Sequence, residues 1–581
     1  MSVVLARTAG FCMGVKRAVD LVLDMTRHKG TEPIYTYGPL IHNPQTVELL
    51  RKRGIIPVSG LEGIASCRPG ATLVVRAHGI SPQERKAIRD KGLKIIDATC
   101  PKVGHVQAII RKHASRDYAI LIIGDEKHPE VSGLLGYAYG RGTAINSPED
   151  VGRLPELEKV CVVAQTTQNT DIFMNLVAAV KARFPDTVVF NTICDSTEKR
   201  QSEIKHMAME ADAIVVVGGR NSANTMQLAR LSELSGASTF HIETADELKN
   251  TAIDRFNRIG VTAGASTPNW IIDRVVDDIS ERQGRAHKPA VGPFQAWLWM
   301  IRTDVYSALG AGCLSLVSMA LQELPVHFLS MLTTALYVYA MHTLNRFINR
   351  EKTSILGSFR EESYRRHSTL YTGSAAAALL VSLFCAFIIG PVPFVLLFLI
   401  SLIGVLYNLN VLPEGWRFRS LKDLPGSKNI SMALAWAAVA AALPRIEAGL
   451  SLTPGVIVAF LFTFALVFIR SALSDILDMQ SDRFIGRETI PVLIGRKRTM
   501  ELLKGIGGIL FSFLLLAFFA EWTSPLALIL LICLFYIWIC FKLCDRRAAF
   551  SAAVLEGLLE TNYVIAGFGA AAWLLATRWF G

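Results

Sequence analysis

Three cysteines in the first half of the chain, Cys12, Cys100 and Cys194, lie at nearly equal intervals along the sequence. After each of them comes a glycine-containing turn with polar residues, and then a second apolar run that also ends in a polar residue. The polar residues of the turns are His42, His128 with Glu130, and Ser222 with Asn224; those after the second runs are His78, Thr166 and Ser266. A unit that is repeated three times can close around a pseudo-threefold axis. We therefore expect three thiolates to meet at one centre, surrounded by these polar side chains.

Three thiolate ligands without a fourth favour a [4Fe–4S] cube in which one iron stays open. The ten cysteines contain no CxxC pair, which argues against a zinc ribbon or a ferredoxin-like run of ligands. An open iron can polarise a substrate oxygen as a Lewis acid and can also deliver electrons. Serine, asparagine, threonine and histidine side chains suit a diphosphate anion, which they bind through hydrogen bonds and charge. The pattern predicts reductive chemistry on a small phosphorylated molecule that carries oxygen.

Glu130 stands two positions after His128 and is a candidate proton donor. A carboxyl group that is shielded from water keeps its proton to higher pH, because burial disfavours the charged form. The simpler interpretation is that Glu130 only neighbours a helix N-terminus. The other cysteines of this half, Cys67 and Cys161, lack the repeated context, and a lone buried cysteine is usually a small apolar core residue.

The elements that must position these residues are short apolar strands that alternate with amphipathic helices. Strands are expected at 71–75, 94–96, 119–123, 160–163, 188–191, 213–217 and 260–262. Helices are expected at 46–53, 82–91, 103–115 and 202–211. This alternation is typical of α/β units with parallel sheets, in which ligands gather beyond the carboxyl ends of the strands. The polar residues above occupy those positions, where helix N-termini also favour phosphate.

The whole chain has 581 residues, which is too long for a single core and predicts several domains. Residues 1–285 read as a soluble α/β protein, whereas long apolar runs with few charges begin near residue 300. The net charge of +11 does not indicate nucleic-acid binding, because much of the basic excess lies in short loops between apolar segments. The first residues lack a signal-peptide pattern, so we expect the first half to stay in the cytoplasm without structural disulfides.

The second half contains nine apolar segments that are candidates for membrane-spanning helices. They are 306–322, 328–343, 374–390, 392–407, 430–443, 454–470, 505–520, 524–540 and 562–577. The connections at 344–373, 408–429 and 471–504 hold many lysines and arginines, whereas the opposite connections hold only Arg445. The positive-inside rule then places the basic loops and the N-terminal half on the cytoplasmic side of a lipid bilayer, with the C-terminus outside.

Asp475, Asp478 and Asp482 follow the sixth of these segments, at spacings that place them on one helix face. Carboxylates grouped in this way suit Mg²⁺ that is bound to a diphosphate. The simpler interpretation is a solvated acidic loop.

Eight stretches of the first half resemble the 4-hydroxy-3-methylbut-2-enyl diphosphate reductases, the LytB family. They are Thr8–Val15, Gly38–Asn43, Arg76–Gly79, Asp97–Pro101, His128–Val131, Gln165–Thr167, Asn191–Cys194 and Gly264–Pro268. The resemblance covers residues 1–282 and implies a trefoil of three α/β units around a [4Fe–4S] cluster. It also implies reduction of 4-hydroxy-3-methylbut-2-enyl diphosphate to isopentenyl and dimethylallyl diphosphate, the last step of the non-mevalonate isoprenoid route. The implied electron donor is reduced ferredoxin or flavodoxin.

The same resemblance implies roles for individual residues. The implied cluster ligands are Cys12, Cys100 and Cys194. The implied diphosphate cradle consists of His42, His78, His128, Ser222, Asn224 and Ser266. Glu130 would be the proton source, in a path that includes His128, and Thr166 would orient the substrate hydroxyl. Ala223 stands where the family commonly has a second serine, which removes one donor and is expected to tune binding.

The second half resembles the UbiA-type membrane prenyltransferases over roughly residues 295–581, through its apolar segments and the aspartate motif. That family carries another aspartate motif after the second span, where this chain reads NRFINRE from Asn345 to Glu351. The asparagine is kept, whereas Arg346 and Asn349 replace aspartates. The resemblance implies a magnesium–diphosphate site at Asp475, Asp478, Asp482 and Asn345. Arg346 beside a metal would repel it, although its guanidinium could itself bind phosphate.

These inferences divide the chain into a reductase domain at 1–282, a linker at 283–294 and a membrane domain at 295–581. The preferred interpretation is a bifunctional chain in a bacterial inner (cytoplasmic) membrane, which it crosses several times with the reductase domain in the cytoplasm. The second half then transfers prenyl groups to an unidentified acceptor. The alternatives are a second half that is only a membrane anchor or polyprenyl-phosphate-binding module, and a first half that is a cluster-based sensor.

Overall fold

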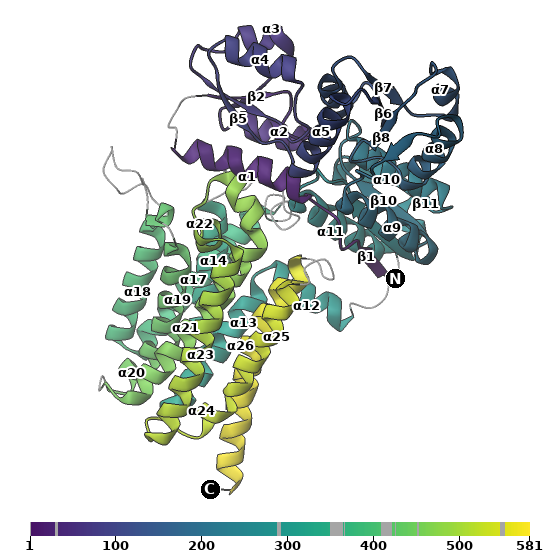
Figure 1. Ribbon diagram of the computed structural model, residues 1–581. Coiled ribbons are helices and arrows are strands. Elements are labelled where there is room, and N and C mark those ends of the chain that lie inside the picture. The colour runs from purple at the N-terminus through teal and green to yellow at the C-terminus, as the bar shows by residue number, and fades with distance from the viewer. Residues whose placement is uncertain are drawn as a thin grey trace. The chain divides into compact units, whose positions relative to one another are not determined.

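The computed structural model describes residues 2–28, 33–286, 292–348, 364, 367–407, 421–424, 426–449, 452–545 and 552–580. The chain divides into two compact units, Met1–His287 and Lys288–Gly581 (Figure 1). The first unit is α/β, and the described part of the second is helical. Parts of the predicted linker and of the predicted basic loops lie outside the described residues, namely 287–291, 349–363, 365–366 and 408–420.

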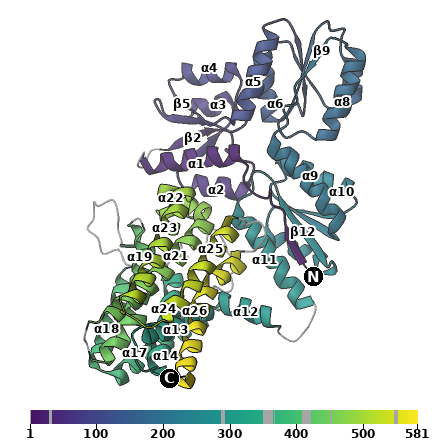
Figure 2. The same cartoon turned by 60° about the horizontal axis from the view of Figure 1, so that its bottom comes forward.

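The first unit contains three four-stranded sheets in which all paired strands are parallel (Figures 1 and 2). The strands are β1 (Ser2–Leu5), β2 (Ile34–Tyr37), β3 (Ile55–Val58), β4 (Thr72–Val75), β5 (Lys94–Asp97), β6 (Ala119–Ile123), β7 (Gly142–Ile145), β8 (Val160–Ala164), β9 (Thr187–Val189), β10 (Ala213–Val217), β11 (Ser238–Ile242) and β12 (Arg258–Ala263). Their orders are β1-β12-β10-β11, β3-β2-β4-β5 and β7-β6-β8-β9. The structure thus confirms three α/β units with parallel sheets.

Helices connect these strands and cover the sheets. They are α1 (Met13–His28), α2 (Pro44–Arg51), α3 (Gly60–Ala65), α4 (Pro82–Asp90), α5 (Pro101–Ala114), α6 (Pro129–Leu135), α7 (Pro148–Arg153), α8 (Thr170–Arg183), α9 (Asp195–Glu210), α10 (Ala223–Leu234) and α11 (Asn269–Ala286), with 3-10 turns at Gly136–Ala138, Ala245–Asn250 and Ile253–Arg255. Several begin at strong caps. Ser81 and Glu84, for example, form a reciprocal capping box at the start of α4.

The three sheets share one connectivity. In each, the first strand is central, the second is the edge beside it, the third is the other central strand and the fourth is the opposite edge. The sets in this order are β2-β3-β4-β5, β6-β7-β8-β9 and β10-β11-β12-β1. Cys100, Cys194 and Cys12 each follow the fourth strand of a set. The cysteine therefore closes each repeat, whereas the sequence pattern suggested that it opens one, and the third set is completed by the first strand of the chain.

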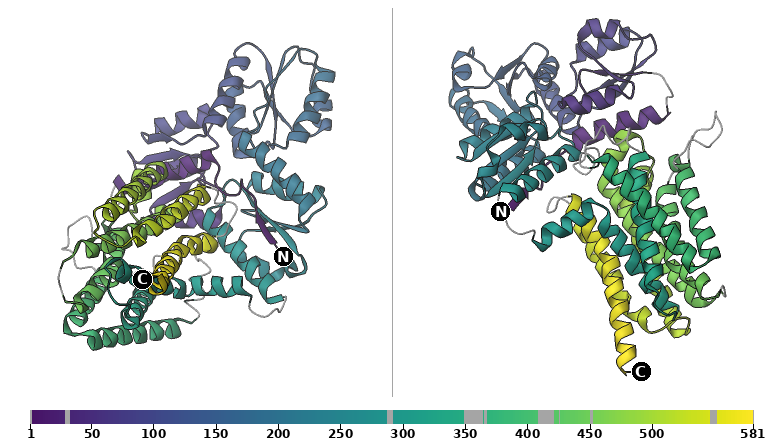
Figure 3. Two further views of the ribbon diagram at one scale, coloured as in Figure 1. Left: turned by 90° about the horizontal axis from the view of Figure 1, so that it is seen from below. Right: turned by 180° about the vertical axis from the view of Figure 1, so that it is seen from behind.

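The second unit is a helical bundle (Figure 3). Its helices are α12 (Pro293–Arg302), α13 (Val305–Leu321), α14 (Phe328–Ile348), α17 (Ser368–Ile389), α18 (Pro391–Leu406), α19 (Ser427–Ala437), α20 (Leu443–Glu447), α21 (Pro454–Ile485), α22 (Ile490–Ile494), α23 (Arg496–Phe519), α24 (Leu526–Ile529), α25 (Leu531–Asp545) and α26 (Ala552–Phe580), with a 3-10 turn at Leu421–Asp423 and a π-helical segment at Ala438–Ala442.

The length and composition of these helices indicate a multi-pass membrane protein. In the described part of the chain, six helices are long and apolar enough to cross a bilayer, or up to seven if the bent pair α12 and α13 counts as one span. Each of the nine predicted segments overlaps a helix. The number nine is nevertheless not confirmed, because α18 has only 16 residues and α14 does not meet the criterion for a span.

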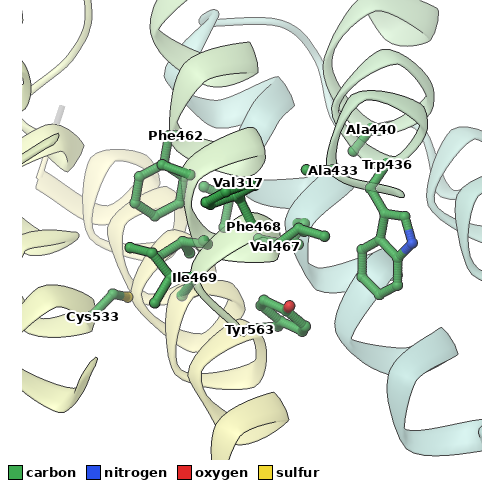
Figure 4. Packing of buried hydrophobic residues seen from close by; sticks show 14 of the residues in the cluster. Val317, Ala433, Trp436, Ala440, Phe462, Val467, Phe468, Ile469, Cys533 and Tyr563 are labelled. Atoms are coloured by element: carbon green, nitrogen blue, oxygen red, sulfur yellow. The ribbon is translucent and has the colours of Figure 1, made fainter. Parts of the chain in front are cut away.

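The bundle core is formed by buried apolar side chains from many of its helices (Figure 4). The rings of Trp436 on α19 and Tyr563 on α26 lie 5.5 Å apart between centroids. Phe462 on α21 and Val317 on α13 belong to the same cluster. Helix α21 is the most buried of the candidate spans and packs against α13, α19 and α23. It carries the predicted aspartate motif near its C-terminal end.

Candidate functional site

Each of the three repeat cysteines stands at the N-terminus of a helix. Cys12 precedes α1, and Cys100 and Cys194 are the N-cap residues of α5 and α9. The N–H of Val15 donates to Cys12 Sγ at 3.5 Å, and the N–H of Lys102 donates to the Cys100 sulfur. Helix N-termini stabilise negative charge and therefore favour a thiolate over a thiol.

The three cysteines also share one electrostatic environment. Burial raises the pKa of the Cys100 thiol, and nearby negative charge on Cys12 and Cys194 raises it further. All three are partly exposed, whereas Cys67 and Cys161 are buried. Three soft sulfur donors that repel each other as thiolates gain most from a shared cationic centre. This donor set fits an iron–sulfur cluster with three protein ligands.

Helix α1 approaches Cys100 closely at Gly14. A Cβ atom at this glycine would lie 2.7 Å from Cys100 Sγ and 3.1 Å from Cys100 Cβ. These separations are too short for van der Waals contact, so any larger residue must displace the sulfur.

Replacing Gly14 with alanine is expected to lower cluster occupancy at least about threefold, because the new methyl group displaces Cys100 Sγ. The helix itself does not oppose this change, since alanine favours an α-helix over glycine by about 1 kcal/mol. Iron and sulfide analysis of anaerobically purified protein measures the occupancy. Gly104→Ala on α5 is the matched control, because no atom lies within 4 Å of its added Cβ. Full occupancy in Gly14→Ala would contradict the close approach.

One backbone hydrogen bond joins each cysteine to a polar loop of the same sheet. The three bonds run from Cys12 N–H to Ala265 O (3.1 Å), from Cys100 N–H to Ala77 O (2.9 Å) and from Cys194 N–H to Thr166 O (2.9 Å). Ala265 and Ala77 directly precede Ser266 and His78. The repeat thus places Ser266, His78 and Thr166 beside the three cysteines, with Thr166 itself as the acceptor and Ser266 and His78 each one position after the accepting residue.

His42, His78 and His128 form one cluster, in which their candidate ligand nitrogens all lie within 4.8 Å of one another. Three imidazoles of this kind could hold a metal ion. However, His128 Nδ1 accepts a hydrogen bond from the Glu130 N–H at 3.2 Å. A neutral His128 then carries its proton on Nε2, where the ring is a donor and not a ligand. The cluster therefore suits an anion better than a cation.

Burial keeps the three imidazoles uncharged near neutral pH. It lowers the pKa of His128 to about 4 and the pKa of His78 well below its usual value, and positive charge on the other histidines and on Arg76 contributes. Burial likewise lowers the pKa of His42. A bound dianion would act in the opposite direction and favour protonation of the cluster.

Several buried donors around the histidines have no hydrogen-bond partner among the described residues. They are His42 Nε2, His78 Nδ1 and Asn224 Nδ2. Ser222 and Ser266 lie beside these atoms but have partners, since Ser266 Oγ lies 3.5 Å from Ser222 Oγ and donates to His42 O at 3.3 Å. Unsatisfied buried donors are costly unless a ligand or water binds them. Their concentration at one place fits a diphosphate group.

Glu130 and Thr166 form a buried pair. The Thr166 N–H donates to Glu130 Oε1 at 2.7 Å, and the Thr166 hydroxyl donates to Glu130 Oε2 at 2.9 Å. Only 1% of Glu130 is exposed. This burial raises the pKa of the Glu130 carboxyl, although the two hydrogen bonds oppose the shift. Hydrogen bonds and the histidine cluster thus link the predicted residues of the first half into one region, except Asn224, which is placed only by its position two residues after Ser222.

The sequence interpretation gave no role to Arg76, which stands two positions before His78. Its side chain is partly buried, with Nε shielded from solvent, and its charge lowers the pKa of His42, His78 and His128. A Cβ atom at Gly38 would lie 2.4 Å from Arg76 Nη1, so this glycine makes room for the arginine. Arg76 belongs to the motif Arg76–Gly79, which the sequence analysis did single out. The environment of its charge could not be predicted from the short apolar run before it.

In the second unit, two of the predicted metal ligands are buried and paired with cations. Asp475 Oδ1 lies 2.7 Å from Lys428 Nζ, and Asp482 Oδ1 lies 3.7 Å from Arg487 Nη1. Asp475 Oδ2 is buried without a hydrogen-bond partner among the described residues, whereas Asp478 is exposed. The carboxylates suit one Mg²⁺, although Lys428 and Arg487 already offset part of their charge.

The part of the predicted metal site around Asn345 does not fit a second cation of its own. Asn345 is half-buried on α14, and the adjacent Arg346 binds Asp304 through Nε (2.8 Å) and Nη2 (2.7 Å). The hydroxyl of Tyr364 also donates to Asp304, at 2.7 Å. Asn349 lies outside the described residues. A fixed guanidinium thus occupies the position at which an aspartate would bind metal.

Known proteins resemble both units. A model of the LytB protein family matches residues 3–280. The 4-hydroxy-3-methylbut-2-enyl diphosphate reductase of Opitutus terrae is 46% identical over 283 residues, which cover 98% of that protein and 47% of this chain. The chain belongs to the LytB family. The reductase of the same name from Aquifex aeolicus is 41% identical to the LytB-family unit over 284 residues. These residues make up 96% of that protein and 48% of this chain.

A solved structure resembles the first unit, and a second family model matches the second unit. The structure of the Plasmodium falciparum E-1-hydroxy-2-methyl-but-2-enyl-4-diphosphate reductase is 30% identical, with a TM-score of 0.46, and covers 47% of this chain and 86% of its own. A model of the UbiA prenyltransferase family matches residues 305–559. The protein is therefore a fusion of a LytB-family unit and a UbiA-like membrane unit.

Proposed function

We propose that the LytB-family unit reduces (E)-4-hydroxy-3-methylbut-2-enyl diphosphate to isopentenyl and dimethylallyl diphosphate, the last step of the non-mevalonate isoprenoid pathway. The observation that carries this proposal is the threefold arrangement of cysteines at helix N-termini beside a cradle of unpartnered donors. Identity of 46% to a reductase of this name, over 98% of its length, supports it.

In this proposal Cys12, Cys100 and Cys194 hold a [4Fe–4S] cluster. When bound, the cluster supplies electrons and an open Lewis-acidic iron. The overall reaction takes up two electrons and two protons, breaks the bond between carbon and the hydroxyl oxygen, and releases water. The electrons come from reduced ferredoxin or flavodoxin.

The protein residues bind the substrate and move protons. The diphosphate lies against His42, His78, His128, Ser222, Asn224 and Ser266. Thr166 orients the substrate hydroxyl, because its own hydroxyl proton is directed at Glu130 and its oxygen is free to accept. Glu130 donates the proton that leaves with the oxygen, in a path that includes His128. The hydrogen bond from the Glu130 backbone N–H to His128 Nδ1 orients this ring.

The domain boundaries in this proposal are a reductase at 1–282, a linker at 283–294 and a membrane domain at 295–581. The membrane domain spans a bacterial inner membrane nine times, with the reductase in the cytoplasm, and transfers a prenyl group to an unidentified acceptor. Asp475, Asp478 and Asp482 bind the Mg²⁺ of the prenyl diphosphate, and Asn345 completes this site. The pairing of Arg346 with Asp304 favours a single magnesium ion.

The second candidate function of the membrane domain is a non-catalytic anchor or polyprenyl-phosphate-binding module, which the cation partners of Asp475 and Asp482 favour.

The reductase proposal is tested by anaerobic assay of the full-length protein with a dithionite-reduced dye. We expect consumption of the hydroxylated diphosphate and release of both five-carbon products. A protein that binds the cluster but leaves the substrate unchanged would instead be a cluster-based sensor.

The membrane domain is tested in the full chain, reconstituted in lipid nanodiscs with the reductase inactivated by Cys100→Ser. Radiolabelled geranylgeranyl diphosphate is expected to bind in the presence of Mg²⁺ and to lose affinity at least about tenfold in Asp482→Asn, because a carboxylate ligand is lost. The exposed Glu521→Gln is the control. Binding that does not depend on Mg²⁺ would indicate a binding module, and absence of binding would indicate an anchor.

A further inference from the structure

A buried arginine lies close to two of the three cysteines. Arg200 is on α9, the helix that begins after Cys194, and only 3% of it is exposed. Its Nη1 donates to Ala263 O at 2.9 Å, and its Nη2 donates to Gly10 O at 2.7 Å. Gly10 lies in the loop that leads to Cys12. One guanidinium therefore joins the helix of one cysteine to the loop of another (Figure 2 shows α9 beside β12).

The charge of Arg200 is poorly compensated by other protein groups. Its Nε has no hydrogen-bond partner among the described residues. The carboxylate that acts on it is that of Glu203, whose oxygens accept hydrogen bonds from Arg7 N–H, Thr8 N–H and the Thr8 hydroxyl. A guanidinium stays protonated, and a buried charge is costly unless an opposite charge lies near.

Negative charge at the cysteines supplies the missing compensation. Burial lowers the pKa of Arg200, whereas charge on Cys12, Glu203 and Cys194 raises it, in that order of size. Two of these three groups are the proposed cluster ligands. Negative charge at the cysteines therefore adds to that of the Glu203 carboxylate in compensating the guanidinium.

We propose that Arg200 is the buried counter-charge of the thiolate-bound cluster and that it raises the reduction potential of this cluster. The inference rests on the proposed function of the LytB-family unit. Reduction adds one electron to an assembly that is already negative. A fixed positive charge in a site with little water stabilises the reduced form more than the oxidised form, because charges interact strongly where the dielectric is low. Arg200 thereby makes the cluster accessible to its electron donor, and it is a positioning residue, not a catalytic one.

Lys102 provides a matched contrast. It also interacts electrostatically with two of the cysteines, Cys100 and Cys194. However, its side chain is 46% exposed and its Nζ lies 2.9 Å from Asp195 Oδ1. Solvent and the paired carboxylate screen such a charge, so it contributes little to the potential.

The test is an EPR-monitored potentiometric titration of the full-length protein, purified anaerobically, with iron and sulfide content measured first. At the potential where the wild-type cluster is half reduced, Arg200→Gln is expected to lower the ratio of reduced to oxidised cluster about tenfold. For a one-electron couple this change equals 59 mV. Arg200→Lys keeps the charge and is expected to change the ratio by less than about threefold, and Lys102→Gln by less than about twofold.

Each outcome decides the question. An Arg200→Gln protein that holds its cluster with an unchanged ratio overturns the inference. If Arg200→Gln loses the cluster, Arg200→Lys decides: a retained cluster with the wild-type ratio supports the counter-charge, whereas loss of the cluster in both shows that Arg200 only clamps the Gly10 and Ala263 carbonyls. A wild-type protein without any cluster would remove the proposed function itself, which is a different result.

Discussion

Replacing Cys100 with serine is expected to remove the cluster and to lower reductase activity by at least about 10³-fold. The change deletes one of three sulfur ligands and leaves a hydroxyl, which is a weaker ligand for iron. It also breaks the threefold arrangement in which each ligand sits at a helix N-terminus. Brown colour, iron and sulfide should all fall to background in anaerobically purified protein.

The control for this prediction is Cys67→Ser. Cys67 is buried in the apolar core of the β2–β5 sheet, and its thiol donates to Gly63 O at 3.5 Å, a bond that a serine hydroxyl can also make. This variant should keep both cluster and activity. A Cys100→Ser protein with a full complement of iron would show that the three cysteines do not share one centre.

Replacing Glu130 with glutamine is expected to keep the cluster and to lower kcat by about 10²–10⁴-fold, because the amide does not donate the proton that general acid catalysis requires. The fold is expected to tolerate the change. The amide oxygen can still accept from the Thr166 N–H, and the Thr166 hydroxyl can turn to accept from the amide nitrogen.

The pH dependence of turnover is expected to differ between the wild-type protein and Glu130→Gln. Burial raises the pKa of Glu130, and in the proposed mechanism the protonated carboxyl is the active form. Turnover of the wild-type protein should therefore fall as the pH rises through this raised pKa, and Glu130→Gln should lack that decline. Steady-state kinetics between mildly acidic and alkaline pH measures the effect, with the exposed Glu126→Gln as control. Unchanged turnover in Glu130→Gln would remove Glu130 from the role of proton donor.

Five of the six central strands, β4, β6, β8, β10 and β12, were predicted from the sequence, as were the edge strands β5 and β9, whereas the central strand β2 and the edge strands β1, β3, β7 and β11 were not. β8 and β10 are buried at every position and appear in the sequence as uninterrupted apolar runs. The edge strands β3 and β7 have partly exposed positions and therefore lack such runs, and β3 also contains Pro57. β1 was missed for another reason, since it pairs only with β12 at the far end of the domain. A local sequence pattern does not predict pairing between strands that are more than about 250 residues apart.

The residues of the candidate site likewise include some that the sequence predicted and some that it did not. His42, His78 and His128 occupy matching places in the repeat, and this regularity predicted that they would meet. Arg200 was not found, because an arginine on a helix with many charged residues reads as a solvent-facing side chain. The cation partners of Asp475 and Asp482 were also missed, since they depend on how α21 packs against its neighbours.

The pairing of β1 with β12 has a consequence for how the protein matures. The first strand of the chain has no partner on the ribosome until the last strand of the LytB-family unit has been synthesised. Cys12 therefore reaches its place only after Cys100 and Cys194 are already folded beside their own sheets. Under the proposed function, iron and sulfide delivery waits for this late closure, and a nascent chain that stalls before residue 263 is expected to leave the ribosome without a cluster.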